Sequence, residues 1–138
     1  MQISRALLDE VVAHAREEAP KECCGLIASQ DGRAVAVHRM RNVAINPKAA
    51  YYMDGQEQYR VEMGIYDAGL DLGAIYHSHP RTEPVPSQTD VNLGQHPDTV
   101  YIIVGLDGDE PQVRAWRIVD GTVSEAVLEV QDGTPAGG

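Results

Sequence analysis

Two histidines, a serine and an aspartate lie within fourteen residues of this 138-residue chain, at positions His77, His79, Ser87 and Asp90. Residues 71–77 contain a short apolar run that is typical of a β-strand. Side chains two residues apart on an extended backbone project from one face, so both imidazoles can reach one metal ion. A catalytic zinc site has three protein ligands and leaves the fourth position to water. The spacing therefore predicts a metal site in which Asp90 is the third ligand.

Ser87 has two compatible interpretations. Residues 87–90 (SQTD) have the S-x-x-D pattern of a capping box, which opens a helix. A serine held at a helix start also has a fixed direction, and its hydroxyl can donate a hydrogen bond to a developing oxyanion. Pro80, Pro84 and Pro86 restrict the loop that leads to this serine, which lowers the entropy lost when the site is assembled.

These residues resemble a known motif. Residues 77–80 (HSHP) and 86–90 (PSQTD) are similar to the JAMM motif of MPN-plus metalloproteases, which also use a glutamate well upstream at the edge of a strand. Residues 20–27 (PKECCGLI) resemble the P-x-E-x-C-G segment of that family, and Glu22 is the matching position. The resemblance extends to about residue 130. It is closest to the short bacterial Mec-type enzymes, because the proline-rich loop and residues 116–121 are also similar.

The resemblance implies a zinc hydrolase. It assigns His77, His79 and Asp90 to the metal and Glu22 to proton transfer, first as general base and then as general acid. Zinc lowers the pKa of a bound water towards about 7 and polarises a carbonyl group. Imidazole and carboxylate ligands also accept iron or cobalt, so the choice of zinc depends on the family and on geometry.

The resemblance also implies a substrate. Mec-type relatives cleave the bond after a C-terminal Gly-Gly of a ubiquitin-like or sulfur-carrier protein, releasing cysteine, another amino acid or a peptide, and the cysteine completes a biosynthetic pathway. A glycine tail can thread a narrow groove and pair through its backbone with a strand edge. Such a carrier protein is the expected partner.

Several alternatives remain. The same site is compatible with hydrolysis of small amides or cell-wall peptides, and the fold is compatible with an inactive MPN scaffold. The last residues, Gly137 and Gly138, raise the hypothesis that the tail enters a substrate groove itself. Cys23 and Cys24 are adjacent and lack a histidine at a matched position, so buried thiols are expected rather than a disulfide framework or a cysteine nucleophile.

Composition limits the remaining classes of protein, partner and cellular location. Apolar residues make up 43% and charged residues 23%, as in ordinary globular domains. Eleven Lys and Arg against 21 Asp and Glu give a net charge of −10, without a basic cluster, so nucleic acid is an unexpected partner. The first residues lack a long apolar run, so neither a secretory signal nor a membrane span is expected and a cytoplasmic protein is predicted.

Helical periodicity and turn residues predict the elements that position the site. The order predicts an α/β (α+β layered) domain, a mixed sheet flanked by helices, consistent with the cytidine-deaminase-like fold of the resembled family. One domain is expected over 1–130 and a flexible tail over 131–138. Helices are predicted over 5–18, 55–68 and 87–95, and strands over 22–29, 34–41, 71–77, 99–105, 113–119 and 122–130.

Aromatic, methionine and histidine side chains outside the motif are expected to have structural rather than catalytic roles. Tyr59, Met63 and Tyr66 recur on the second predicted helix and are expected in the core. His14, His38 and His96 lack the spacing of metal ligands and are expected at the surface or at helix ends. The path of residues 42–54 is not predicted.

Overall fold

A computed structural model describes residues 1–132 of the chain. Residues 133–138, which contain Gly137 and Gly138, lie outside the described part, and so does most of the tail expected over 131–138. The helices are α1 (Arg5–Glu18), α2 (Gly55–Asp67) and α3 (Gln88–Leu93). The strands are β1 (Gln2–Ser4), β2 (Cys24–Gln30), β3 (Arg33–Met40), β4 (Asp71–His79), β5 (Val100–Gly105), β6 (Gln112–Val119), β7 (Thr122–Ala126) and β8 (Glu129–Gln131).

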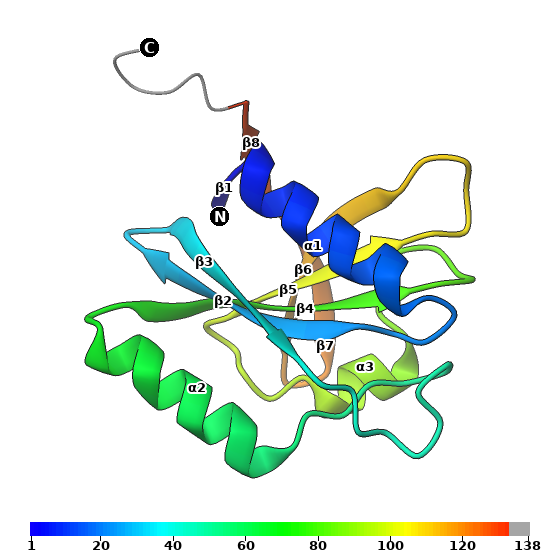
Figure 1. Ribbon diagram of the computed structural model, residues 1–138, viewed down its shortest axis with the longest axis horizontal. Helices are drawn as coiled ribbons and strands as arrows, with labels where there is room; N and C mark the ends of the chain where they lie inside the picture. Colours follow the sequence, from blue (N-terminus) through cyan, green and yellow to red (C-terminus); the bar gives the residue numbers. More distant parts are fainter. Residues whose placement is uncertain (133–138) are drawn as a thin grey trace.

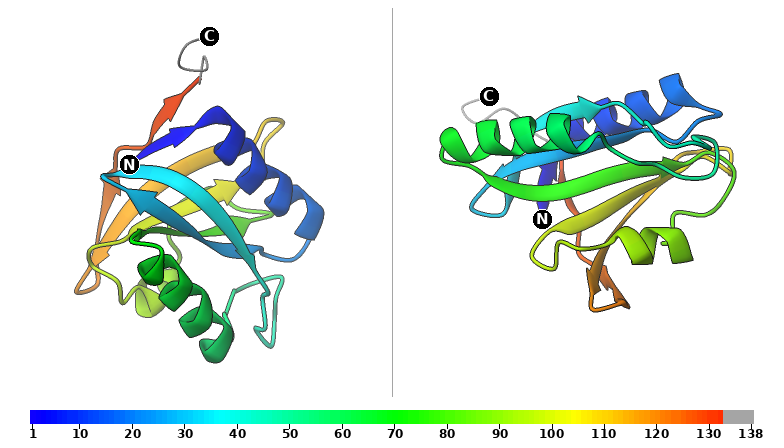
Figure 2. Two further views of the ribbon diagram at one scale, coloured as in Figure 1. Left: turned by 60° about the vertical axis from the view of Figure 1, so that its left-hand side comes forward. Right: turned by 90° about the horizontal axis from the view of Figure 1, so that it is seen from below.

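All eight strands form one mixed sheet in the order β7-β6-β5-β4-β2-β3-β1-β8. β4 is central, antiparallel to β2 and parallel to β5. Figure 1 shows α1 and α2 on either side of the central strands, and Figure 2 shows the arrangement from two other directions. Apolar side chains of α1 join one core cluster, whereas those of α2 and α3 join a second cluster on the opposite face of the sheet. The predicted mixed sheet with flanking helices is confirmed.

Capping and turn residues determine where α1 and the β2–β3 hairpin begin and turn. Ser4 caps α1, because its hydroxyl accepts a hydrogen bond of 3.2 Å from the backbone N–H of Leu7. The turn between β2 and β3 has Asp31 at φ 51° and Gly32 at φ 79°, the positive pair that a two-residue hairpin of matching twist requires. The resulting hairpin is antiparallel and carries one register shift between Ala28 and Ser29.

Two strand predictions were wrong. The segment predicted as one strand over 122–130 forms two strands that lie at opposite edges of the sheet. β7 pairs antiparallel with β6, whereas β8 pairs parallel with β1, a short strand that was not predicted. Short edge strands are defined by their distant partners, so residue pattern alone does not reveal them.

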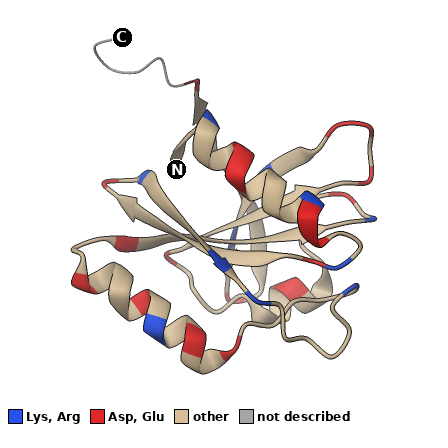
Figure 3. Ribbon diagram, viewed as in Figure 1, with Lys and Arg blue, Asp and Glu red and all other residues tan. Residues whose placement is uncertain are grey.

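The expected core residues of α2 are exposed. Tyr59 is 67% exposed, and Met63 and Tyr66 are also at the surface, while Ile65 is buried. The prediction was wrong because α2 packs on the sheet through a narrow stripe of Val61 and Ile65. In the described part of the chain, no helix combines the length and the apolarity needed to cross a bilayer. Figure 3 shows the positions of lysine and arginine interspersed along the ribbon with those of aspartate and glutamate.

The prediction for His14 was also wrong, because this side chain is 3% exposed instead of lying at the surface. Its Nδ1 atom is 2.7 Å from the hydroxyl of Tyr76, which is also buried. This hydrogen bond joins α1 to β4, one residue before the first predicted metal ligand. Burial lowers the pKa of His14, and Arg39 lowers it further, although the carboxylates of Glu18 and Glu17 oppose the change.

The lowered pKa of His14 predicts a contribution to acid sensitivity. In the unfolded chain a histidine has a pKa of about 6.5, so below this pH the unfolded state binds more protons than the native state. The stability that neutral His14 contributes is therefore complete above pH 6.5 and falls as the pH decreases. We expect His14→Asn, which cannot titrate, to lose less stability than the wild type between pH 7.5 and pH 5 in urea unfolding. Equal losses in both proteins would contradict this account.

Candidate metal centre

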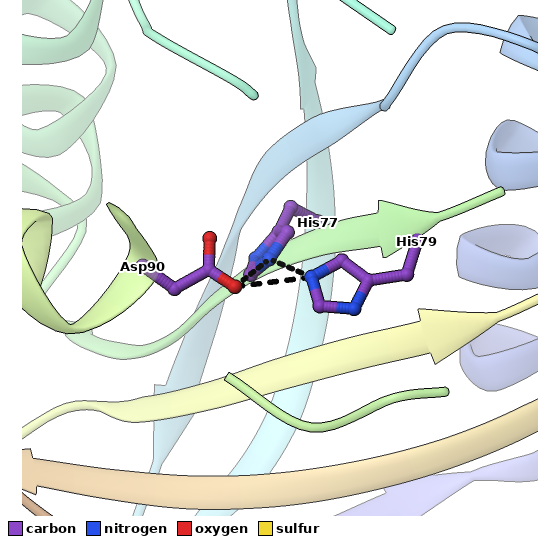
Figure 4. Close-up of side chains that lie close together, drawn as sticks. All are labelled: His77, His79 and Asp90. Atoms are coloured by element: carbon purple, nitrogen blue, oxygen red, sulfur yellow. Dashed lines mark hydrogen bonds and ion pairs between the residues drawn. The ribbon is translucent and has the colours of Figure 1, made fainter. Parts of the chain in front are cut away.

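His77 and His79 lie at the C-terminal end of β4 and point to the same side of the sheet, as their spacing predicted (Figure 4). Asp90 reaches them from α3, and all three side chains are buried. The Oδ2 atom of Asp90 is 3.1 Å from Nε2 of His77 and 3.0 Å from Nε2 of His79, and the two Nε2 atoms are 3.2 Å apart. Asp90 is thus brought together with histidines eleven and thirteen positions before it in the sequence, and the three form a compact triangle of potential ligand atoms.

The triangle has the size that a tetrahedral metal site requires. Zinc bonds of about 2.0–2.1 Å at the tetrahedral angle place neighbouring ligand atoms about 3.3 Å apart. The observed separations of 3.0–3.2 Å are slightly smaller. Two imidazole nitrogens and one carboxylate oxygen also form a suitable donor set for zinc. The residues therefore fit a zinc ion that has three protein ligands and one open position.

Neighbouring groups orient both imidazoles. Nδ1 of His79 lies 2.8 Å from the backbone carbonyl of Glu83, to which it must donate, so that Nε2 keeps its lone pair for a metal. The ring of Tyr51 stacks on His77, with centroids 4.5 Å apart and an interplanar angle of 26°. Among the described residues, Nδ1 of His77 has no hydrogen-bond partner. The loop after β4 and the segment before α2 thus support the two ligands.

Ser87 and Asp90 form the predicted capping box at the start of α3. The Ser87 hydroxyl accepts a hydrogen bond of 3.1 Å from the Asp90 N–H, and the Ser87 N–H donates one of 2.9 Å to Asp90 Oδ2. The carboxylate oxygen that faces the histidines is therefore also fixed by the helix start. Ser87 itself is exposed, so its hydroxyl is open to a substrate.

Electrostatics favour the metal-binding protonation state of Asp90 and His77, but not that of His79. Burial alone would raise the pKa of Asp90, but the close contacts of its Oδ2 atom with the imidazoles of His77 and His79 outweigh burial and hold this pKa well below its usual range. Burial lowers the pKa of His77. Burial also acts to lower the pKa of His79, but its hydrogen bonds to Asp90 and Glu83 raise it overall. Ionised Asp90 and neutral His77 are the ligand forms that bind a cation.

Glu22 is buried near these ligands, with 6% of its surface exposed. Burial raises its pKa to about 7, while the charges of His79 and Asp90 act on it in opposite directions. Its Oε1 atom has no hydrogen-bond partner among the described residues. Such an orphaned acceptor is costly in a folded protein, and a water or ion is the usual reason for it. Glu22 lies two residues before β2 begins, rather than at the first residue of the predicted strand.

The backbone next to Glu22 is fixed to β4. The N–H of Cys23 donates a hydrogen bond of 2.8 Å to the hydroxyl of Ser78, and the N–H of Ser78 donates one of 3.2 Å to the Cys23 carbonyl. Cys23 and Cys24 are both free and buried, as predicted. Burial raises the pKa of each thiol to about 12, so neither is a thiolate nucleophile near neutral pH.

Two cavities lie along β4. One of about 250 Å³ is lined by Tyr51, Leu93, Tyr101 and Gln58, and the ring of Tyr51 in turn stacks on His77. A larger one, of about 520 Å³, lies beside Asp71 at the opposite end of β4 and contains none of the predicted site residues. The smaller cavity is the nearer of the two to the predicted ligands, although none of the predicted site residues lines it.

Comparison with known proteins agrees with this geometry. Residues 4–119 match the family described as prokaryotic homologs of the JAB domain. The chain belongs to this family. A CysO-cysteine peptidase of Mycobacterium tuberculosis is 39% identical over 127 residues, which cover 90% of this chain and 86% of the relative. A desampylase of Haloferax volcanii is 42% identical over 106 residues, 72% of this chain and 76% of the relative. A probable TtuB-protein conjugate cleaving protease of Thermus thermophilus is 36% identical over 119 residues, which cover 86% of this chain and 76% of the relative.

Solved structures show the same fold for this JAB domain. A protein of Desulfitobacterium hafniense has a TM-score of 0.84 and 27% identity, covering 95% of this chain and 92% of its own. A JAB1/MPN domain protein of Archaeoglobus fulgidus has a TM-score of 0.65 at 23% identity, and the match covers 94% of this chain and 98% of that protein. The JAB domain described here is an enzyme, a hydrolase of the JAMM peptidase type.

Proposed function

We propose that this JAB domain is a zinc-dependent peptidase that hydrolyses the bond after the C-terminal Gly-Gly of a ubiquitin-like or sulfur-carrier protein, releasing cysteine or another attached amino acid or peptide. The observation that carries the proposal is the buried triangle of His77, His79 and Asp90 beside the orphaned carboxyl oxygen of Glu22. Two of the relatives support the substrate, because their names specify CysO-cysteine and TtuB-protein conjugates.

His77, His79 and Asp90 would hold the zinc ion. When bound there, zinc would lower the pKa of a water molecule to about 7 and polarise the scissile carbonyl. The protein supplies the orientation of the ligands through Glu83, Tyr51 and the capping box. Exclusion of bulk water at these buried side chains strengthens each electrostatic interaction in the site.

Glu22 transfers the proton. Its carboxylate accepts a proton from the attacking water as the new C–O bond forms, and returns it to the departing amine nitrogen as the C–N bond breaks. A pKa raised to about 7 by burial suits a group that must both accept and give a proton near neutral pH. Glu22 is therefore general base and then general acid in one turnover.

Ser87 stabilises the developing oxyanion. Its hydroxyl oxygen accepts the Asp90 N–H, which leaves the hydroxyl hydrogen free to donate to a substrate oxygen. Because the capping box fixes the serine before substrate arrives, little reorganisation is needed during the reaction.

The Gly-Gly preference is expected from the way a glycine tail binds, since it can thread a narrow groove and pair through its backbone with a strand edge. The cavity of about 250 Å³, lined by Tyr51, Tyr52 and Leu93, is the candidate for this groove, because Tyr51 stacks on His77. A cytoplasmic location is part of the proposal, and the free thiols of Cys23 and Cys24 agree with a reducing compartment.

The substrate proposal predicts strong selectivity for carrier fusions. We expect kcat/KM for a sulfur-carrier protein ending in Gly-Gly-Cys to exceed by at least 10-fold that for the same fusion with Ala-Ala-Cys, because each added Cβ must fit beside the ligands. Release of cysteine, followed by mass spectrometry, measures both rates. Short peptides and cell-wall peptides provide the comparison. If they are cleaved as fast as the carrier fusion, the protein is a hydrolase of small amides or cell-wall peptides instead.

A further inference from the structure

The segment between β3 and α2 has no regular secondary structure, but the side chain of Asn42 organises it. We define residues 43–53 as the clamp loop. The two ends of this loop, its middle and the backbone of Glu22 just before β2 meet at the half-buried side-chain amide of Asn42. This amide makes five hydrogen bonds. Its Nδ2 atom donates to the carbonyls of Glu22 at 3.0 Å, Ala50 at 3.0 Å and Pro47 at 3.4 Å, and its Oδ1 atom accepts from the N–H groups of Ala44 at 3.0 Å and Tyr52 at 3.1 Å.

The clamp loop holds the backbone of Glu22. β2 begins only at Cys24, so the ladder hydrogen bonds of the sheet do not include Glu22. Instead its N–H donates to the Pro47 carbonyl at 2.8 Å, and its carbonyl accepts from Asn42 at 3.0 Å. Both backbone groups of the proposed proton carrier are thus satisfied by one side chain and by the loop that this side chain organises.

The same loop carries Tyr51, which is 8% exposed and stacks on the ring of His77. The N–H of the next residue, Tyr52, donates to Asn42. Release of the Asn42 amide would therefore free two parts of the centre together, the backbone of Glu22 and the ring that supports one ligand. The three ligand side chains themselves come from β4 and α3 and have no contact with Asn42 among the hydrogen bonds of the described residues.

We propose that Asn42 is a positioning residue for the reaction: it fastens the clamp loop to Glu22, and so places the proton-transfer carboxylate and Tyr51 against the metal centre. The proposal rests on the proposed function of Glu22. A side-chain amide has two N–H donors for carbonyl oxygens on one side and an acceptor oxygen for N–H groups on the other, whereas a hydroxyl or a neutral imidazole has only one donor. Partners of this kind around a metal site typically change activity by about 10–100-fold when removed.

Two variants separate the parts of the clamp. Asn42→Ala removes all five hydrogen bonds. Asn42→Asp keeps the acceptor for Ala44 and Tyr52 but turns a carboxylate oxygen towards the Glu22 carbonyl. The matched control is Asn92→Ala, because Asn92 is exposed on α3 and its amide oxygen bonds only the side chain of Gln88 in the described structure.

Four measurements are made on the full chain: zinc content, kcat and KM on the Gly-Gly-Cys fusion, thermal unfolding, and hydrogen exchange of backbone amides. For Asn42→Ala we expect one zinc per chain, kcat about 10–100-fold lower, KM within 3-fold, and faster exchange at Glu22, Ala44 and Tyr52. For Asn42→Asp we expect a comparable loss of kcat with protection kept at Ala44 and Tyr52.

Three results would overturn the proposal. One is a kcat of Asn42→Ala within 2-fold of that of Asn92→Ala. The second is unchanged exchange at Glu22 and Tyr52, and the third is a parallel loss of zinc and kcat, which would make Asn42 a support of the metal ligands instead. Hydrogen exchange tests the clamp without catalysis. If the zinc-loaded wild type cleaves no carrier fusion, the proposed function fails, while the exchange data still decide whether Asn42 fastens Glu22.

Discussion

Replacing Glu22 with glutamine should lower kcat on a Gly-Gly-Cys carrier fusion by about 10²–10⁴-fold while one zinc ion per chain remains bound. The amide has nearly the same shape as the carboxyl group but cannot accept the proton of the attacking water. Because His77, His79 and Asp90 supply the proposed ligands, the metal content should not change. Steady-state kinetics and elemental analysis on the same preparation measure the two quantities.

The thermal stability of the Glu22→Gln variant distinguishes loss of chemistry from loss of fold. Glu22 is buried and its Oε1 lacks a partner in the described structure, so its charged form is costly to keep in the native state. A neutral amide at this position should unfold at the same temperature as the wild type or higher, as often happens when an active-site strain is removed. Glu10→Gln, at an exposed position on α1, is the matched control and should keep full activity. A Glu22→Gln variant that keeps a tenth of wild-type kcat would rule out the proposed role.

The sequence predicted the centre because most of its geometry is local. Two histidines separated by one residue share a face of any strand, and the structure places His77 and His79 in this way. The S-x-x-D pattern predicted a helix start, and the same capping bonds direct Asp90 towards the histidines. Glu22 is different, because it precedes His77 by 55 residues in sequence and meets the centre only through the pairing of β2 with β4. No local pattern gives that pairing, so the choice of Glu22 depended on the family resemblance.

What the sequence did not predict depends on contacts between distant segments. His14 looked like a surface residue on an amphipathic helix, but Tyr76 of β4 provides a buried partner for its ring. The roles of Asn42 and Tyr51 were also not predicted, since nothing in residues 42–54 indicated a regular element. Their partners, Glu22 just before β2 and His77 in β4, are distant in sequence. Periodicity reports which face of an element is buried, whereas the identity of the neighbour comes only from the tertiary fold.

Replacing Asp90 with alanine should remove the metal and with it all measurable cleavage. Asp90 would supply one of three proposed ligand atoms, and two imidazoles alone would leave the ion with mostly water ligands. Binding of zinc to the native state alone stabilises it by about 2.7 kcal/mol when free zinc is 100 times its Kd. A chelator should therefore lower the unfolding temperature of the wild type by several degrees and have little effect on Asp90→Ala. Elemental analysis and thermal unfolding, each with and without chelator, measure these effects.

The double role of Asp90 requires a control, because alanine there also breaks the capping box. Ser87→Ala removes the acceptor of the Asp90 N–H but leaves the carboxylate, so it should lose about 1 kcal/mol of stability and still bind zinc. The cap and the ligand are thus separable, since only Asp90→Ala should abolish the chelator effect. If Asp90→Ala kept zinc at the wild-type level, the carboxylate would be a helix cap alone and the triangle of ligand atoms would need another third member. If Ser87→Ala also lost zinc, the capping bonds would be what orients the ligand, and metal binding would depend on the helix start as a whole.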